Sequence, residues 1–277
     1  MSHALSDQEL VRREALQKLR ALGIDPFPAA EFPVTHHAAQ VKEQFKEVGH
    51  APEGAQPDAS VVMAGRLMSV RVMGKASFAV IRDASGDQQI YINRDEIAPG
   101  EDKTVYNEVF KKLLHLGDLI GVRGFAFRTQ TGELTLHVKE LTVLAKSLRP
   151  LPVVKTDEQG NVHDAFTDPE LRYRMRYVDL IVNPGVKETF LKRTRIFNAM
   201  RTAFQEAGYL EVDTPVLQPI PGGAAARPFA THHNALDVPF FLRIANELYL
   251  KRLIVGGLEG VFEFSRNFRN EGMDRTH

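Results

Sequence analysis

The chain of 277 residues carries 35 Lys and Arg side chains against 35 Asp and Glu, contains no Cys or Trp, and is 43% apolar. This length corresponds to about two domains with cores of their own. The absence of Cys excludes disulfides, thiolate zinc sites, iron–sulfur clusters and a thiol nucleophile. No apolar run approaches the ~20 residues that a membrane-spanning helix needs. Because the charged N-terminus also differs from a signal peptide, we expect a cytoplasmic protein with no membrane partner.

Residues 1–60 are predicted to form an N-terminal helical extension and a spacer. Ser6 and Glu9 form a capping-box pattern ahead of apolar residues that recur at helical spacing, which predicts a helix over residues 6–22. Gly23 supplies the stop signal for this helix. The Gly-, Pro- and Ala-rich residues 48–60 then read as a spacer.

From Val61 the sequence changes to short β-type segments rich in Val, Ile, Phe and Tyr, separated by Gly and Asp turns. Three such segments precede a short helix that is marked by Tyr106, Phe110 and Leu113, and two more segments follow it. This order is typical of a five-stranded OB-fold β-barrel, which we place at residues 61–146. The helix between the third and fourth strands is the more specific signal, because a plain β-meander would not need it.

The predicted barrel carries candidate nucleic-acid contacts. Residues 59–82 contain four cations and no acid, which indicates either a phosphate-facing surface or a strand edge protected by positive charge. Arg71 and Phe78 lie on the first two strands and Gln89 on the third. Phe78 is either a stacking platform for an unpaired base or a core residue, and the Gln89 amide has the groups to read a base edge.

Residues 147–166 contain two prolines and mixed charge and are interpreted as a linker. Beyond it, residues 167–277 are predicted to form a second domain. A helix is expected to start at Thr167, with Pro169 in its first turn, and a longer amphipathic helix to cover residues 186–207.

The end of the chain combines an apolar strand with a dense polar run. Phe262 and Phe264 alternate along the predicted strand, which leads into several arginines, Glu271 and His277. Guanidinium groups are natural partners of phosphate and carboxylate, so this run indicates either a ligand site or a salt-bridged loop. The histidine pairs at 36–37 and 232–233 are poor chelates, because adjacent strand residues point to opposite faces, and no metal site is expected in this chain.

Five strings of this sequence together closely resemble bacterial-type class II lysyl-tRNA synthetases, and the barrel with its MGKASF string (73–78) fits the same family. The five are RYRMRYVDL (172–180), PIPGGAAARPF (219–229), HHNALD (232–237), ELYLKRLIVGG (247–257) and FEFSRNFRNEG (262–272). The resemblance implies an α+β protein, in which the OB-fold barrel precedes the first part of a class II antiparallel-sheet catalytic domain. It also implies a homodimer, with the helix over residues 186–207 at the interface.

The resemblance assigns roles to residues of the second domain. Arg269 matches the catalytic arginine that holds the α-phosphate of ATP and the carboxylate of lysine. Glu271 matches the residue that binds the adenine amino group, and His277 matches one near the triphosphate. Gly223 and Glu247 match positions that hold the α-amino group of lysine.

In the barrel, the resemblance assigns Arg71, Phe78 and Gln89 to the recognition of the tRNA anticodon. The implied partners are therefore tRNA(Lys), lysine and ATP. One departure stands next to a site residue, since Asn246 replaces the proline that the family usually has before Glu247.

The implied activity is that of a lysine–tRNA ligase, which forms lysyl-adenylate from lysine and ATP and transfers the lysyl group to tRNA. Because the sequence ends within the second class motif, we expect the third class motif and the magnesium ligands to lie beyond His277, and the 277-residue chain alone to be inactive. Two alternatives stay open: an aspartate- or asparagine-type synthetase, and a non-catalytic tRNA-binding OB-fold fragment.

Overall fold

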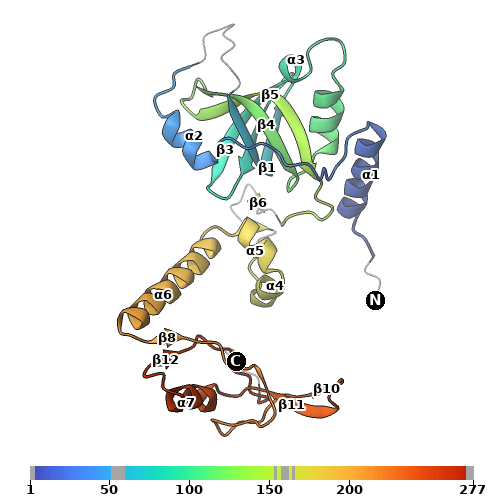
Figure 1. The fold of residues 1–277 in the computed structure, drawn as a ribbon. Coiled ribbons are helices and arrows are strands. Elements are labelled where there is room, and N and C mark those ends of the chain that lie inside the picture. The colour runs from blue at the N-terminus through green and yellow to red at the C-terminus, as the bar shows by residue number, and fades with distance from the viewer. Residues whose placement is uncertain (1–3, 51–59, 153–154, 157–161, 164–165, 273–277) are drawn as a thin grey trace. The chain divides into compact units, whose positions relative to one another are not determined.

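The computed structural model divides the chain into two units, Met1–Val178 and Asp179–His277. It describes residues 4–50, 60–152, 155–156, 162–163 and 166–272 (Figure 1). His277, most of the predicted spacer and part of the predicted linker lie outside these residues. None of the helices in the described part of the chain is long and apolar enough to cross a membrane.

The first unit begins with helix α1 (Asp7–Ala21), and its start confirms the predicted capping box. The Ser6 side chain accepts from the Glu9 amide at 3.4 Å, and the Ser6 amide donates to Glu9 Oε2 at 2.9 Å. These bonds satisfy amide groups that have no partner inside the helix. Helix α2 (Ala38–Gln44) follows, and the Asp83 carboxylate accepts from the amide of Ala38 at its start, at 2.7 Å.

Five strands of the first unit close into a barrel in the order β1-β2-β3-β5-β4. They are β1 (Val61–Met73), β2 (Ala76–Arg82), β3 (Asp87–Asn93), β4 (Leu119–Arg128) and β5 (Leu134–Ala145). Among these five strands, β3 and β5 pair in parallel and the other neighbours pair antiparallel. Between β3 and β4 lie the short helix α3 (Arg94–Ile97) and the π-helix η1 (Val105–Leu113), so the predicted helix between the third and fourth strands is present. The predicted OB-fold barrel is confirmed.

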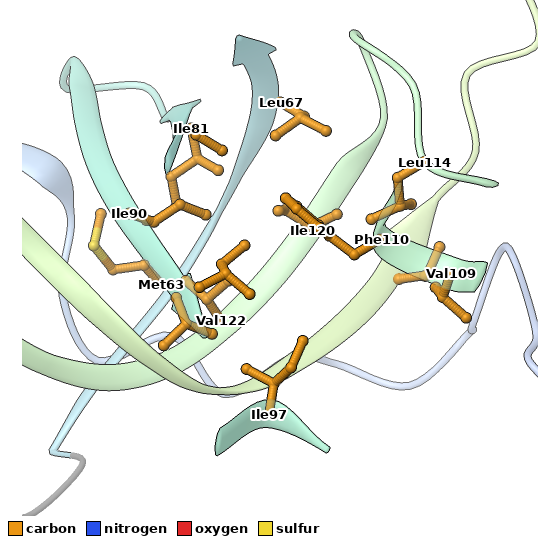
Figure 2. Close-up of a cluster of buried hydrophobic side chains, with 14 of the residues drawn as sticks. Met63, Leu67, Ile81, Ile90, Ile97, Val109, Phe110, Leu114, Ile120 and Val122 are labelled. Atoms are coloured by element: carbon orange, nitrogen blue, oxygen red, sulfur yellow. The ribbon is translucent and has the colours of Figure 1, made fainter. Parts of the chain in front are cut away.

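The barrel interior is filled by apolar side chains that alternate along the strands (Figure 2). In β2 and β3 every second residue is buried, with Ile81, Ile90 and Ile92 all at most 1% exposed. Phe110 from η1 closes the same cluster at 2% exposure. Burial of side chains of this size stabilises the fold by roughly 1.5–3 kcal/mol each. The alternation leaves the intervening residues of each strand on the outer face.

The pairing of β4 with β5 changes register between Arg123 and Gly124, as expected for a β-bulge. A Cβ atom at Gly124 would lie 2.0 Å from the carbonyl oxygen of His137. Any other residue would therefore force the two strands apart, so the close approach of β4 and β5 requires glycine here.

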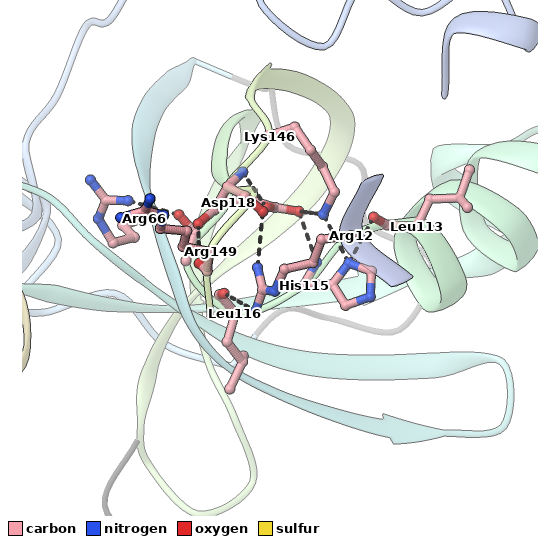
Figure 3. A network of polar contacts seen from close by, with 10 residues as sticks. Arg12, Arg66, Leu113, His115, Leu116, Asp118, Lys146 and Arg149 are labelled. Atoms are coloured by element: carbon pink, nitrogen blue, oxygen red, sulfur yellow. Dashed lines mark hydrogen bonds and ion pairs between the residues drawn. The ribbon is translucent and has the colours of Figure 1, made fainter. Parts of the chain in front are cut away.

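A buried polar network joins α1 to one end of the barrel (Figure 3). Asp118 and Lys146 form an ion pair at 2.6 Å with both side chains fully buried. Arg12 of α1 donates to the carbonyl groups of Leu116 at 2.9 Å and Ser147 at 3.1 Å. Since a buried charge that loses its partner costs several kcal/mol, this network fixes the position of α1 on the barrel.

Two strands and two helices follow the barrel along the chain. Strands β6 (Lys155–Thr156) and β7 (Val162–His163) pair over two residues. Helices α4 (Pro169–Arg174) and α5 (Arg176–Val182) meet at Met175, and the division between the two units falls within α5. The N-cap of α4 is Asp168, whose side chain accepts from the Leu171 amide. The predicted start at Thr167 is therefore one residue early, because the carboxylate of Asp168 caps the helix in its place.

The second unit contains the predicted long helix, α6 (Val186–Glu206), followed by short strands. Strands β9 (Leu217–Gln218), β10 (Ala230–His233) and β11 (Val238–Leu242) form an antiparallel sheet in the order β10-β11-β9. Strands β8 (Leu210–Glu211) and β12 (Val261–Phe262) pair in parallel, and helix α7 (Glu247–Val255) precedes β12. The predicted α+β class is confirmed. The strand expected to run through Phe264 is shorter, since the paired residues end at Phe262.

Two partly buried histidines predict a pH dependence of stability. Burial and the nearby charges of Lys146 and Arg12 lower the pKa of His115, and burial lowers the pKa of His137. Below about pH 6.5 the unfolded chain therefore binds protons that the folded chain does not. We therefore expect the free energy of unfolding to fall as the pH is lowered from 7.5 to 5.5. Each histidine contributes at most about 1.4 kcal/mol for each pH unit, and urea titrations at several pH values would measure the change.

The variant His115→Gln tests this explanation. It removes one of the two titrating groups, so the pH slope of the unfolding free energy should become smaller. Carboxylates titrate at more acidic pH. Burial acts to raise the pKa of Asp83, but hydrogen bonds from Ala38, Ser85 and Gly86 outweigh it and lower the pKa. The contribution of Asp83 to the free energy of unfolding is therefore lost only below this pH range. A slope that stays unchanged in the variant would refute the assignment to His115.

Candidate functional site

One row of side chains crosses all five strands on the outer face of the barrel. The strand registers pair Arg71 with Phe78, Phe78 with Tyr91, Tyr91 with His137, and His137 with Phe125. Paired residues on one face of a sheet lie next to each other, so the five side chains form a continuous band. Two of the three predicted anticodon residues, Arg71 and Phe78, belong to it.

The ring contacts along this row are close enough for aromatic packing. Phe78 and Tyr91 have their ring centroids 5.2 Å apart, Tyr91 and His137 4.9 Å, and His137 and Phe125 4.8 Å. The guanidinium carbon of Arg71 lies 5.8 Å from the centroid of Phe78, within cation–π range. Phe78 is half-buried and is not part of the barrel core, so it is not a core residue; its role as a stacking platform stays a prediction.

Gln89 lies in the neighbouring row, next to Phe78 and Tyr91 on the same face. Its register partners are Val80 on β2 and Thr135 on β5, and Thr135 is paired in turn with Phe127. The side-chain amide of Gln89 donates to Thr135 Oγ1 at 2.8 Å, which fixes its orientation. The structure therefore brings together all three residues predicted to read the anticodon.

The four cations of residues 59–82 divide into two kinds. Arg66 donates to the Gly117 carbonyl at 2.7 Å, and Arg82 donates to Asp87 at 2.8 Å, so both hold the barrel together. Arg71 and Lys75 are exposed. The positive charge available to a phosphate is thus smaller than the composition indicates.

One acidic residue lies beside the aromatic row. Glu96 Oε2 is 2.9 Å from His137 Nε2 and also forms an ion pair with Lys139. Burial lowers the pKa of His137, and Lys139 adds to this effect although Glu96 opposes it. The imidazole of His137 is therefore neutral at neutral pH, and it packs against Tyr91 without the cost of burying a charge.

In the second unit, the residues predicted to hold the α-amino group of lysine meet. Gly223 has a φ of 89°, and a Cβ atom there would lie 3.1 Å from that of Ala245 and 3.4 Å from that of Glu247. The loop over residues 219–229 therefore packs directly against the start of α7. The Glu247 carboxylate is half-exposed and pairs with Lys251 on the same helix at 2.5 Å.

The segment that carries Arg269 is held on both sides of that residue. The amide of Phe268 donates to the Arg243 carbonyl at 2.9 Å, and the amide of Asn270 donates to the Arg227 carbonyl at 2.8 Å. These bonds join it to the segments that carry Glu247 and Gly223. The side chains of Arg269 and Glu271 are exposed, and His277 lies outside the described residues.

The described residues contain no group of three or more His, Asp or Glu side chains that could hold a metal ion. The histidine pairs have other contacts, since His36 Nε2 lies 2.9 Å from Gln44 Oε1 and His232 Nε2 lies 3.1 Å from Asp237 Oδ1. We therefore assign no metal ligand in this part of the chain.

Comparison with protein families matches two parts of the chain. Residues 61–144 match the model of the OB-fold nucleic acid binding domain, and residues 168–277 match that of class II tRNA synthetases of the D, K and N type. Two sets of features, the outer barrel face and the Gly223–Glu247 contact, fall within these matches.

Individual relatives match nearly the whole chain. It is 63% identical over 273 residues to the lysine–tRNA ligase of Porphyromonas gingivalis and 61% identical to that of Christiangramia forsetii, in each case over 99% of this chain and 46% of the relative. The lysine–tRNA ligase of Azobacteroides pseudotrichonymphae is 59% identical over the same share of this chain and 53% of its own length. The chain is thus similar to lysine–tRNA ligases along nearly all of its own length. It spans about half the length of these curated relatives.

Sequence reasoning missed several residues of the outer row. Tyr91, His137 and Phe125 join Phe78 only through the pairing of β3, β5 and β4. Tyr91 stands two positions after Gln89 and so shares its face of the strand, which was a usable signal. No signal of this kind linked His137 or Phe125 to the row, because they lie on strands that are distant in the sequence.

The outer row predicts that Phe78 is an anchor for unpaired bases. We expect Phe78→Ala to weaken binding of a single-stranded RNA to this chain by roughly 5- to 150-fold, the equivalent of about 1–3 kcal/mol for one stacked base. Fluorescence anisotropy would measure the affinity. Phe27→Ala is a matched control, since Phe27 is 45% exposed and lies outside the row. Equal weakening by both variants would contradict the prediction.

Proposed function

We propose that this chain supplies the tRNA-binding barrel and part of the amino-acid and ATP site of a cytoplasmic lysine–tRNA ligase. The observation that carries the proposal is the contact of Gly223 with Glu247 beside the anchored Arg269 segment. In domain terms, an extension (1–60), an anticodon-binding barrel (61–146) and a linker (147–166) precede the class II part (167–277).

In the proposed first step, a carboxylate oxygen of lysine attacks the α-phosphorus of ATP, and pyrophosphate leaves. The Gly223 carbonyl and the Glu247 carboxylate hold the α-amino group of lysine, and its ammonium replaces Lys251 as the partner of Glu247. The Arg269 guanidinium binds the carboxylate and the α-phosphate, because its cation stabilises the charge that develops at phosphorus. Glu271 accepts from the adenine amino group, and the resemblance assigns a triphosphate contact to His277, which lies outside the described residues.

In the second step, a ribose hydroxyl at the 3′ end of tRNA(Lys) attacks the carbonyl carbon of lysyl-adenylate, and AMP leaves. The barrel selects the tRNA for this step. Phe78 stacks on one unpaired anticodon base, Arg71 adds cation–π contact and phosphate attraction, and the oriented amide of Gln89 reads a base edge.

ATP is a substrate in this proposal, and magnesium ions accompany it in the family. The described residues of this chain do not form a group that fits such an ion. We therefore derive no step through magnesium and expect its protein ligands outside this part of the enzyme.

Helix α6 supports the proposal of a homodimer. None of its side chains is buried, and Ile196 is 59% and Met200 43% exposed. Apolar side chains on an exposed helix face are typical of a protein–protein interface. Phe197 and Phe204 instead contact Phe264 and Phe262 of the same unit, with centroids 4.9 and 4.8 Å apart.

The amino-acid specificity and the role of Arg269 are tested by ATP–pyrophosphate exchange in a full-length enzyme that contains this chain. Exchange should depend on lysine and not on aspartate or asparagine.

The variant Arg269→Ala should lower lysine-dependent exchange by roughly 100-fold or more, since it removes the cation at the reacting phosphorus. Arg20→Ala, an exposed arginine of α1, is the control for loss of a charge. Exchange near the wild-type rate in Arg269→Ala would refute the role.

A second measurement separates the barrel from the activation site. Phe78→Ala should lower kcat/KM for tRNA charging and leave lysine-dependent pyrophosphate exchange unchanged, because exchange needs no tRNA. Equal loss in both assays would refute the barrel assignment. A full-length enzyme that binds tRNA without any exchange would instead favour a non-catalytic tRNA-binding protein.

A further inference from the structure

A buried carboxylate lies at the centre of the second unit. Glu263, directly after β12, is only 3% exposed. It accepts from Arg243 at 2.6 Å, from the Thr214 hydroxyl at 2.7 Å and from the side-chain amide of Asn246 at 3.1 Å. Three donors on one carboxylate offset the cost of burying its charge.

Thr214 is far from the other two donors in the sequence, whereas Arg243 and Asn246 lie on one segment before α7. Thr214 follows β8, Arg243 follows β11, and Asn246 precedes α7. Arg243 also donates to the Thr214 carbonyl and, through Nε, to the Arg266 carbonyl, both at 3.0 Å. Glu263 therefore ties the start of α7 to the segment that leads to Arg269.

Asn246 uses its side chain in an unusual way for its position. It is the N-cap residue of α7, where an Asn side chain ordinarily accepts from an amide in the first turn. Here it makes no such bond, and its Nδ2 donates to Glu263 instead. The side chain thus fixes the position of the helix start relative to β12.

We propose that Asn246, held by Glu263, is a positioning residue that places the Glu247 carboxylate for the α-amino group of lysine. This role rests on the proposed function. Glu247 is the next residue along the chain, so its backbone follows that of Asn246 directly. In the family that this chain resembles, a proline usually stands at this position, and its pyrrolidine ring restricts the backbone torsion φ. In this chain the hydrogen bond from Asn246 to Glu263 restrains the same position.

The hydrogen bonds on either side of Arg269 do not include the Asn246 contact. The Arg269 segment is joined to the rest of the unit by the amides of Phe268 and Asn270, and neither bond involves Asn246. Loss of the Asn246 contact should therefore affect lysine binding far more than ATP binding.

The ionisation of Glu263 makes the contact sensitive to charge. Burial acts to raise the pKa of Glu263, but the hydrogen bonds from Thr214, Asn246 and Arg243 outweigh it and lower the pKa below its ordinary value. At neutral pH the group is a carboxylate. An aspartate at position 246 would set a second carboxylate against it, in nearly the same volume as asparagine.

The test is steady-state pyrophosphate exchange with Asn246→Asp in a full-length enzyme that contains this chain. We expect the KM for lysine to rise roughly tenfold, in line with loss of a hydrogen bond to a charged group, and the KM for ATP to stay within about twofold. Asn246→Ala removes the donor without adding charge and should give a smaller rise of the same kind. It decides the question if Asn246→Asp does not fold, as judged by circular dichroism.

Two further variants separate positioning from general damage. In Asn246→Asp/Glu263→Gln the amide and the carboxylate exchange places, so an amide can again donate across the contact, and the KM for lysine should return toward the wild-type value. Asn107→Asp makes the same chemical change on η1 of the first unit and should leave the KM for lysine unchanged.

The outcomes are distinct. A wild-type enzyme without lysine-dependent exchange refutes the proposed function itself. A wild-type enzyme that exchanges, together with an unchanged KM for lysine in both Asn246 variants, refutes only the role of Asn246. An equal rise of both KM values, or no recovery in the double variant, shows a general structural role and also overturns the proposal.

Discussion

Closure of the five strands into a barrel is the constraint on which the first unit depends. A closed sheet has one inner face, and the inward residues of every strand must fill it with side chains of matching volume. The alternate residues are thereby placed on the outside in fixed cross-strand pairs. The row from Arg71 to Phe125 is a consequence of this closure, since no contact among its members would form in an isolated strand. A one-residue slip of β3 would move Tyr91 into the core and Ile90 onto the outer face.

The second unit is organised by polar contacts to a larger extent. Its strands are two to five residues long, and α6 buries none of its side chains. Side-chain hydrogen bonds of Glu263 and Arg243 join the segments that follow β8, β11 and β12. Such bonds fix geometry more sharply than they add stability, because they require defined distances and angles. This suits the proposed site, whose residues Gly223, Glu247 and Arg269 come from three separate segments.

The elements that the sequence predicted well are those with a local physical signature. The capping box at Ser6, the β-type segments that form β2 and β3, and the long helix α6 depend on neighbouring residues, and the structure has all of them. The site residues Phe78 and Gln89 were named by resemblance to a family, and their roles stay proposals. The partners of these residues could not be named, because the pairing of β3 with β5 joins positions that are 46 residues apart. Glu263 was hidden for a related reason: in an apolar strand pattern it reads as an exposed residue, and only its distant donors explain its burial.

Asn246 shows why a departure from a family pattern has to be judged in three dimensions. In the sequence alone, replacement of proline by asparagine before Glu247 suggests a looser backbone, because proline restricts φ and asparagine does not. In the structure the amide of this asparagine reaches a carboxylate that two other donors already hold in place. A hydrogen bond to a fixed, ionised acceptor restores the restraint that the ring supplied. The two solutions differ in chemistry, however: the ring is indifferent to charge, whereas the hydrogen bond requires Glu263 to stay ionised. The presence of Glu247 alone therefore does not define the proposed site, since we propose that the hydrogen bond between Asn246 and Glu263 sets its position.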